Sequence, residues 1–241
     1  MDRYAITFQV RPGNSERVAE LLAGYPTPEL SAEAGARLLG TTVFLRDDTV
    51  VRVLDVEGPL PVVTRHLAQD PVIAEVERAL NPYLVTPRDL GSPESARRFF
   101  ANALMTPLTV RVAPGQALAG SQRYALVYPI RPGTGAAADA AFAGGGDPPP
   151  PPPGPTKLLG TAVFRKDDLV IRVFDIQGDY DEAVELLAKA RPLQEAGRSL
   201  APFLEPGTDI SDEQGLRRFL RERRMRVVTD RRSSVALGSA A

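Results

Sequence analysis

Arg52 and Arg172 are the first side chains in this sequence whose surroundings suggest chemistry. Both are predicted to point onto an apolar face of a β-strand, because Arg52 alternates with Leu54 and Arg172 repeats the pattern 120 residues later. An arginine on an apolar sheet face is costly unless a partner binds it. That partner could be a phenolate or ketone oxygen of a substrate, which would make the arginines catalytic, or an internal acid such as Asp55 or Asp175.

His66 is a further candidate, and it is the only histidine among the 241 residues. The repeat offset places Leu186 at the equivalent position, so the histidine belongs to one copy alone. Histidine titrates nearest to neutral pH and suits proton transfer there. We take His66 as a candidate catalytic base; the alternative is a surface position on the helix that its segment predicts.

Aromatic side chains in the predicted strands could hold a flat substrate. The residues expected to contact it are Tyr4, Tyr124, Tyr128, Phe44 and Phe164. A phenol hydroxyl can orient a substrate, and Tyr128 adds one where the first copy has Phe8. Because Tyr4 and Tyr124 recur at equivalent positions, simple packing is the alternative for them.

The residue types that are absent narrow the chemistry. The chain has no cysteine, which excludes disulfides, thiolate nucleophiles and cysteine-ligated metal sites. It also lacks the glycine-rich motifs of dinucleotide and nucleotide phosphate sites. A deprotonated phenol or anthrone can pass an electron to O₂ without metal or flavin, given an apolar slot, a base and a cation near the oxyanion. Aldol-type cyclisation needs nearly the same groups, and composition does not separate the two.

The charge pattern disfavours polyanionic partners. The formal net charge is −1, so no long-range field favours nucleic acid or an anionic membrane. The basic run at 217–226 lacks interleaved aromatic residues and is expected to be a solvated helix face. No apolar run approaches the roughly 18–20 residues of a membrane span, and the start shows no export signal, so we expect a cytoplasmic protein.

The chain contains one sequence unit twice. The stretch "LLGTTVFLRDDTVVRVLDVEG" from Leu38 returns from Leu158 as "LLGTAVFRKDDLVIRVFDIQG". Between 38–105 and 158–225, about 25 of 68 positions are identical without a gap. The chain is therefore two fused copies of a unit of roughly 110–120 residues.

Each copy is predicted to have the order strand, helix, two strands, three helices, strand. In the first copy we expect strands at 3–10, 38–46, 49–56 and 105–112, a helix at 14–25, helical segments that meet near Asp70, and a helix at 92–104. Asn14 and Ser92 are the expected N-caps, and Asp47-Asp48 the hairpin turn. Pro107 predicts a sheet edge for the last strand. This order is a ferredoxin-like unit with an elaborated helical crossover.

The fold class that follows is α+β, with two tandem ferredoxin-like repeats. The strands are apolar on both faces, so the face without helices must also be covered, and the other copy is the expected cover. We therefore expect an intramolecular dimeric α+β barrel. The predicted boundaries are a first repeat at 1–113, a linker at 114–122, a second repeat at 123–230 with a polyproline loop at 144–155, and a flexible tail at 231–241.

The motifs "RYA…RPG", "LLGT.VF…DD.V.RV.D" and "RRF" occur in this order in both copies. In these motifs the chain resembles the SchA/CurD-like proteins of aromatic polyketide gene clusters, including spore-pigment clusters. The resemblance implies a dimeric α+β-barrel fold and a tailoring role on a multi-ring polyketide, for which members have been implicated as oxygenases. The resemblance supplies no catalytic motif that could be assigned to residues of this chain.

The sequence thus favours a monooxygenase that needs no cofactor and acts on a polycyclic aromatic polyketide and molecular oxygen. Two alternatives stay open: a cyclase or aromatase of the same pathway, and a polyketide-binding protein without activity. The pairing of two fused chains into a homodimer also stays open.

Overall fold

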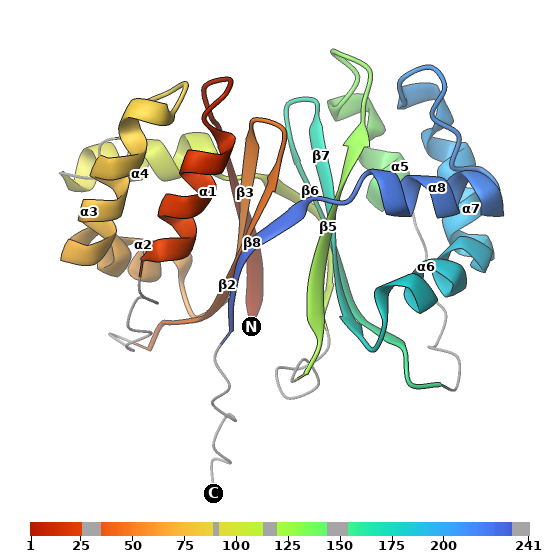
Figure 1. Ribbon diagram of the computed structural model, residues 1–241, viewed down its shortest axis with the longest axis horizontal. Coiled ribbons are helices and arrows are strands. Elements are labelled where there is room, and N and C mark those ends of the chain that lie inside the picture. Colours follow the sequence, from red (N-terminus) through yellow and green to blue (C-terminus); the bar gives the residue numbers. More distant parts are fainter. Residues whose placement is uncertain (26–34, 89–91, 113–119, 144–153, 233–241) are drawn as a thin grey trace, which may run out of the picture. The chain divides into compact units, whose positions relative to one another are not determined.

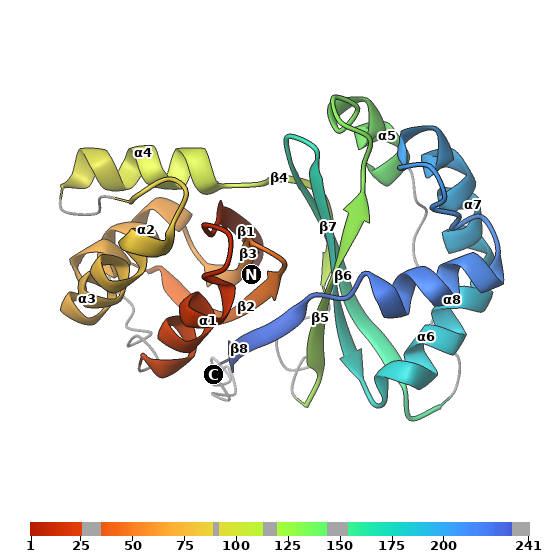
Figure 2. The same cartoon turned by 45° about the horizontal axis from the view of Figure 1, so that its top comes forward.

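The structure is a computed structural model that describes residues 1–25, 35–88, 92–112, 120–143 and 154–232. The chain divides into two compact units. The first unit comprises Met1–Met105 with Arg226–Val235, and the second unit comprises Thr106–Met225. In each unit the helices lie together on one side of that unit's sheet (Figures 1 and 2). The predicted α+β class with two tandem repeats is confirmed.

The first unit has a four-stranded antiparallel sheet in the order β1-β3-β2-β8. Its strands are β1 (Asp2–Gln9), β2 (Arg37–Arg46), β3 (Thr49–Glu57) and β8 (Arg226–Arg232). Its helices are α1 (Ser15–Gly24), α2 (Leu60–Gln69), α3 (Pro71–Leu80), the 3₁₀ helix η1 (Asn81–Tyr83) and α4 (Pro93–Ala103).

The second unit repeats this plan with the order β4-β6-β7-β5. Its strands are β4 (Thr106–Val112), β5 (Gln122–Pro129), β6 (Lys157–Lys166) and β7 (Leu169–Gln177). Its helices are η3 (Ala136–Ala138), α5 (Asp139–Ala143), α6 (Tyr180–Lys189), α7 (Arg191–Leu200), η4 (Ala201–Phe203) and α8 (Glu213–Glu222).

The closing strands of the two units are exchanged, which corrects the expectation that 105–112 closes the first sheet. β4 pairs with β6 of the second unit, while β8 pairs with β2 of the first. β2 and β6 are identical at six of ten positions, the LLGT and VF stretches, so they present similar edges to a closing strand. The predicted edge position of the strand that carries Pro107 is confirmed.

The exchange bears on the predicted boundaries. Positions 231 and 232, expected in a flexible tail, belong to β8, and position 122, expected in the linker, begins β5. The rest of the predicted tail, most of the linker and most of the polyproline loop lie outside the described residues.

Local signals explain the hairpin and most helix starts. Asp47 adopts a φ of +50° in the two-residue turn, which sets Val43 opposite Arg52 as predicted. The Ser92 side chain accepts a hydrogen bond from the Ser95 amide in a capping box, so that N-cap is confirmed. Asn14 occupies the predicted N-cap position of α1, but its side chain donates to the carbonyl oxygens of residues 11 and 12 and makes no capping hydrogen bond.

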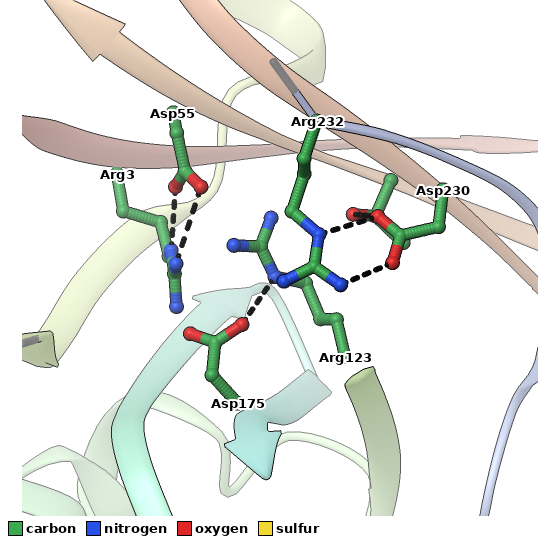
Figure 3. Close-up of polar contacts among 7 residues, drawn as sticks. Arg3, Asp55, Arg123, Asp175, Asp230 and Arg232 are labelled. Carbon is green, nitrogen blue, oxygen red and sulfur yellow. Dashed lines mark hydrogen bonds and ion pairs between the residues drawn. The ribbon is translucent and has the colours of Figure 1, made fainter. Parts of the chain in front are cut away.

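The hairpin strands β2 and β3, and β6 and β7, are buried on both faces, as the two-sided apolar pattern predicts. On the face away from the helices, Phe44, Val51 and Val53 are fully buried in the first unit. The same face carries a buried ion pair in each unit, Arg3 with Asp55 at 2.7 Å and Arg123 with Asp175 at 2.8 Å (Figure 3). Among the described helices, none combines the length and the apolar character needed to cross a membrane.

Candidate functional site: a cationic cavity in the first unit

A cavity lies in the first unit on the helix-covered face of its sheet. Its apolar walls come from the strand residues Ile6, Leu38 and Leu54 and from the helix residues Leu67, Ile73 and Phe99. The enclosed space is small, about 30 Å³, and it reaches about 530 Å³ only when the mouth, which is open to solvent, is included. Five polar residues complete the lining: Tyr25, Thr41, Arg52, Glu77 and Arg88. The cavity is therefore an apolar slot with a few polar groups, the usual composition of a small-molecule site.

Arg52 reaches this cavity from the middle of β3. Strand alternation places it on the same face as Leu54, and its guanidinium carbon lies 5.8 Å from the ring centre of Tyr25. Among the described residues, its buried Nε has no hydrogen-bond partner. Asp55 points to the opposite face and pairs with Arg3, so the internal ion pair that the sequence left open for Arg52 is not formed with Asp55.

Arg88 and Glu77 form a buried ion pair on the cavity wall. Glu77 lies in the buried stripe of α3, and both of its carboxylate oxygens accept from Nη1 of Arg88, at 2.8 and 2.7 Å. Arg88 is 6% exposed, and its Nε and Nη2 have no hydrogen-bond partner in the described part of the chain. Burial lowers the pKa of Arg88 and the nearby Arg52 guanidinium lowers it further, while Glu77 opposes both effects.

The Arg88 side chain is held in place by its neighbours. Its guanidinium carbon lies 3.7 Å from the ring centre of Phe8 and 4.9 Å from that of Phe99, within the range of cation–π interactions. The Asn81 side chain fixes the backbone, because its amide donates to the Arg88 carbonyl and its oxygen accepts from the Arg88 amide, both at 2.7 Å. The conformation of Arg88 is therefore largely fixed before a ligand binds.

Two hydroxyl groups line the cavity beside the charges. The Tyr25 hydroxyl and the Thr41 Oγ1 are buried, and neither has a hydrogen-bond partner among the described residues. Arg231 of the exchanged strand β8 holds Tyr25: its Nη2 donates to the carbonyl oxygens of Ala23 and Tyr25, at 2.9 and 2.6 Å. Its guanidinium also lies 4.3 Å from the Tyr25 ring centre. The last strand of the described chain thus positions a residue of the first unit's cavity.

The electrostatics of the cavity favour an anionic ligand. Its lining contains two guanidinium groups and one carboxylate, which leaves one excess positive charge. In a site largely closed to water, such a charge interacts more strongly with an oxyanion than it would in solution. The N–H groups of Arg52 and Arg88 that lack a partner in the described part of the chain are the donors that a phenolate or enolate oxygen would need.

The second unit lacks the same set of charges. Arg172 repeats Arg52, and its Nε is likewise without a partner among the described residues, but Gly197 and Thr208 stand where the first unit has Glu77 and Arg88. A Cβ atom at position 197 would collide with the carbonyl oxygen of Ile210. The helix packing of the second unit thus leaves no space for a side chain where Glu77 lies in the first.

We predict opposite stability changes for two glycine-to-alanine substitutions. Gly197→Ala should lower the free energy of unfolding by about 1–3 kcal/mol, because the added methyl group overpacks α7 against Ile210. Gly24→Ala, where a Cβ meets nothing within 4 Å, should raise it by about 0.5–1 kcal/mol. Urea unfolding followed by circular dichroism measures both, and equal effects would contradict the predicted overpacking at Gly197.

The structure places several residues predicted from sequence away from the cavity. His66 is half-buried in the last turn of α2, where Leu67 and Ala68 supply the cavity wall. Phe44 and Phe164 lie on the sheet face opposite to Arg52 and Arg172, since they alternate with the inward positions. They therefore do not line this cavity.

The three predicted tyrosines are engaged in packing. Tyr4 packs beside the small cluster that contains Leu38 and Leu54. Tyr124 lies with its ring centre 4.3 Å from that of Tyr180, and Tyr128 lies 4.9 and 4.8 Å from the ring centres of Phe142 and Phe219. Their role as substrate contacts stays a prediction, while Tyr25, which the sequence did not single out, lines the cavity.

Glu77 and Arg88 were also missed, although the sequence carried a signal for both. Glu77 interrupts the apolar stripe formed by Ile73 and Leu80, a costly place for a carboxylate without a partner. Both residues are unrepeated, as His66 is, since the second copy has a glycine and a threonine there. Within the described ranges, no group of three or more histidine, cysteine, aspartate or glutamate side chains is placed to hold a metal ion.

Comparisons with known proteins agree on the family. The SchA/CurD-like domain matches the chain twice, at residues 1–112 and 121–233. A Streptomyces coelicolor protein, the 42.8 kDa protein in the whiE locus, is 40% identical over 243 residues, which cover 96% of this chain and 59% of the relative. Polyketide synthase CurD of Streptomyces cyaneus is 36% identical over 239 residues, 96% of this chain and 64% of the relative. The chain spans about three fifths of the length of these relatives.

A solved structure shares the fold. It belongs to a candidate monooxygenase of Fusobacterium nucleatum and matches with a TM-score of 0.50 at 9% sequence identity. The match covers 96% of this chain and 94% of the other. At this identity the likeness concerns the fold alone.

Proposed function

The chain belongs to the SchA/CurD-like family, and on this premise we propose that it is a tailoring enzyme of aromatic polyketide biosynthesis. In this proposal it is a monooxygenase that oxidises a polycyclic phenol or anthrone without a cofactor. The polyketide context is supported by the relative polyketide synthase CurD, which is 36% identical to this chain. The choice of oxygenation rests on the chemistry of the cavity.

The observation that carries the proposal is an apolar slot whose wall holds guanidinium N–H groups that have no partner among the described residues. Arg52 and Arg88 line the slot together with aromatic and aliphatic side chains. The apolar walls suit a planar aromatic ligand once side chains at the mouth move apart to admit it, and its ionised oxygen supplies the missing hydrogen-bond acceptor. Stabilising that oxyanion makes the bound ring system electron-rich, which is the state that reacts with O₂.

The proposed reaction balances without an added reductant. An anthrone methylene and O₂ give a quinone carbonyl and water: two C–H bonds and the O–O bond break, one oxygen atom stays on carbon, and the other leaves in water. The substrate itself supplies the electrons. Among the described residues that line the cavity, Glu77 is the carboxylate, so in our proposal it receives the substrate proton.

Oxygen uptake tests this function. Purified, chelator-treated protein is mixed with an anthrone in buffer while dissolved O₂ and quinone absorbance are recorded. We expect equal amounts of O₂ consumed and quinone formed with no metal or flavin added. A change in the carbon skeleton without O₂ consumption would identify a cyclase instead, and binding without any reaction would identify a carrier.

We predict a small effect for His66→Ala. Because Leu67 and Ala68, rather than His66, form the α2 part of the cavity wall, the rate of O₂ uptake should stay within about twofold of the unmodified protein, far from the 10²–10⁴-fold that loss of a general base costs. The oxygen electrode measures it with the same anthrone. A loss in that larger range would return His66 to the role of proton acceptor.

A further inference from the structure

Arg88 lines the cavity, and one edge of its guanidinium group has no hydrogen-bond partner among the described residues. Its Nη1 is committed to both oxygens of Glu77, while Nε and Nη2 have no partner among the described residues. Nε and Nη2 lie on the same side of the planar group, with roughly parallel N–H bonds. This is the edge with which arginine binds two oxygens at once, in a bidentate hydrogen bond.

This free edge is buried and fixed before any ligand arrives. Arg88 is 6% exposed and stacks against Phe8 and Phe99, while Asn81 holds its backbone from both sides. A ligand with one oxygen acceptor would leave a second buried N–H group without a partner, which costs free energy. A ligand with two neighbouring acceptors satisfies both N–H groups, and the arginine itself needs little reorganisation.

The charges of the cavity set the charge of this ligand. Arg52, Arg88 and Glu77 together carry one net positive charge. A single negative charge neutralises the site, whereas a neutral ligand leaves a buried positive charge and a dianion adds an unpaired negative charge.

We propose that the Nε–Nη2 edge of Arg88 recognises two neighbouring oxygens that share one negative charge, as in the enolate of a 1,3-dicarbonyl compound or in a carboxylate. Arg52 lines the same cavity and adds a further donor toward this oxygen pair. The inference rests on the proposed function, because it takes the cavity as the substrate site, and it adds the functional group by which the substrate is selected.

Binding of three planar probes tests the proposal. The probes are 2-acetyl-1,3-indanedione, anthraquinone-2-carboxylate and 2-hydroxyanthraquinone, each at a pH at which it is ionised. Equilibrium dialysis under nitrogen gives the dissociation constants with no oxidation involved. We expect the two probes with paired oxygens to bind about tenfold or more tightly than the probe with a lone oxygen. The tighter of these two shows whether an enolate or a carboxylate is preferred.

Matched variants assign the preference to Arg88. Arg88→Lys keeps a charge for Glu77 but lacks the two-pronged edge, and should reduce the preference to less than about threefold. Glu77→Leu/Arg88→Met replaces the pair with apolar side chains and should abolish it. Arg98→Gln, an exposed α4 residue paired with Glu94 at 3.3 Å, should leave it unchanged. Circular dichroism verifies that each variant is folded.

A preference that survives in the folded Arg88→Lys protein, or a lone-oxygen probe that binds as tightly as the others, would overturn the proposal. These outcomes are separable from those of the oxygenase test. Selective binding without O₂ uptake would refute the proposed function alone, and O₂ uptake without selective binding would refute this inference alone.

Discussion

Replacing Arg52 by glutamine is expected to lower the rate of substrate oxidation by about 10²–10³-fold, the usual effect of removing a donor that stabilises an oxyanion. Glutamine keeps much of the length and polarity of the side chain but removes the charge. Because Arg52 lines the cavity and its Nε has no protein partner among the described residues, its loss breaks no internal ion pair with Asp55. The variant should therefore fold normally and fail in the reaction.

Arg172→Gln is the matched test of the same substitution in the other copy. Arg172 lies beside Tyr128, in a unit that lacks the counterparts of Glu77 and Arg88. We expect its rate to stay within about threefold of the unmodified protein, well short of the loss of an oxyanion donor. Rates of O₂ uptake with an anthrone compare the two variants directly. Equal losses would contradict a working site in the first unit alone.

Glu77→Gln is expected to lower the free energy of unfolding by about 3–5 kcal/mol, because it leaves Arg88 buried without a compensating charge. The side chains of this pair are 10% and 3% exposed, so water cannot replace the lost partner. Urea unfolding followed by circular dichroism measures the loss. The same variant should also lose oxidation activity, since Glu77 is the proposed proton acceptor.

The double variant Glu77→Leu/Arg88→Met separates the charge from the packing. Removing both charges and filling the space with apolar side chains should restore most of the stability, since a buried pair contributes little net free energy compared with well-packed apolar groups. Activity should not return. A double variant as unstable as Glu77→Gln would contradict the role of charge compensation and would point to packing as the cause.

The sequence predicted the repeats and most elements because local patterns decide them. Alternating apolar residues predicted the strands, and the Asp47-Asp48 turn gave the hairpin register that sets Val43 opposite Arg52. The Ser92 cap was predicted for the same reason, since its partner Ser95 lies only three residues away. Asn14 holds the predicted N-cap position but makes no capping hydrogen bond, because its side chain donates to nearby carbonyl oxygens instead.

The exchange of the last strands could not be predicted from local patterns. Both β4 and β8 follow an α-helix and both meet the edge of the same kind of hairpin, β6 or β2. Which strand joins which sheet depends on contacts between residues far apart in the chain, such as Thr42 with Asp230, whose side chains are joined by a 2.8 Å hydrogen bond. Strand propensity does not contain this information.

The candidate site was predicted in part. Arg52 was found because it breaks the apolar alternation of its strand, a local signal. Glu77 and Arg88 were missed because their role depends on an ion pair between residues 11 positions apart. Tyr25 was missed because Arg231, 206 residues away in the chain, holds it at the cavity. His66 was predicted because histidine suits proton transfer near neutral pH. The way α2 is turned about its own axis places Leu67 and Ala68, and not His66, in the cavity wall.

Incorporation of isotopic oxygen tests the central claim most directly. Chelator-treated protein is incubated with an anthrone under ¹⁸O₂, and the product is analysed by mass spectrometry alongside Arg52→Gln. The proposed chemistry predicts one ¹⁸O atom per molecule of quinone with the unmodified protein and almost no product with the variant. Product without ¹⁸O, or equal labelled product from both proteins, would contradict it.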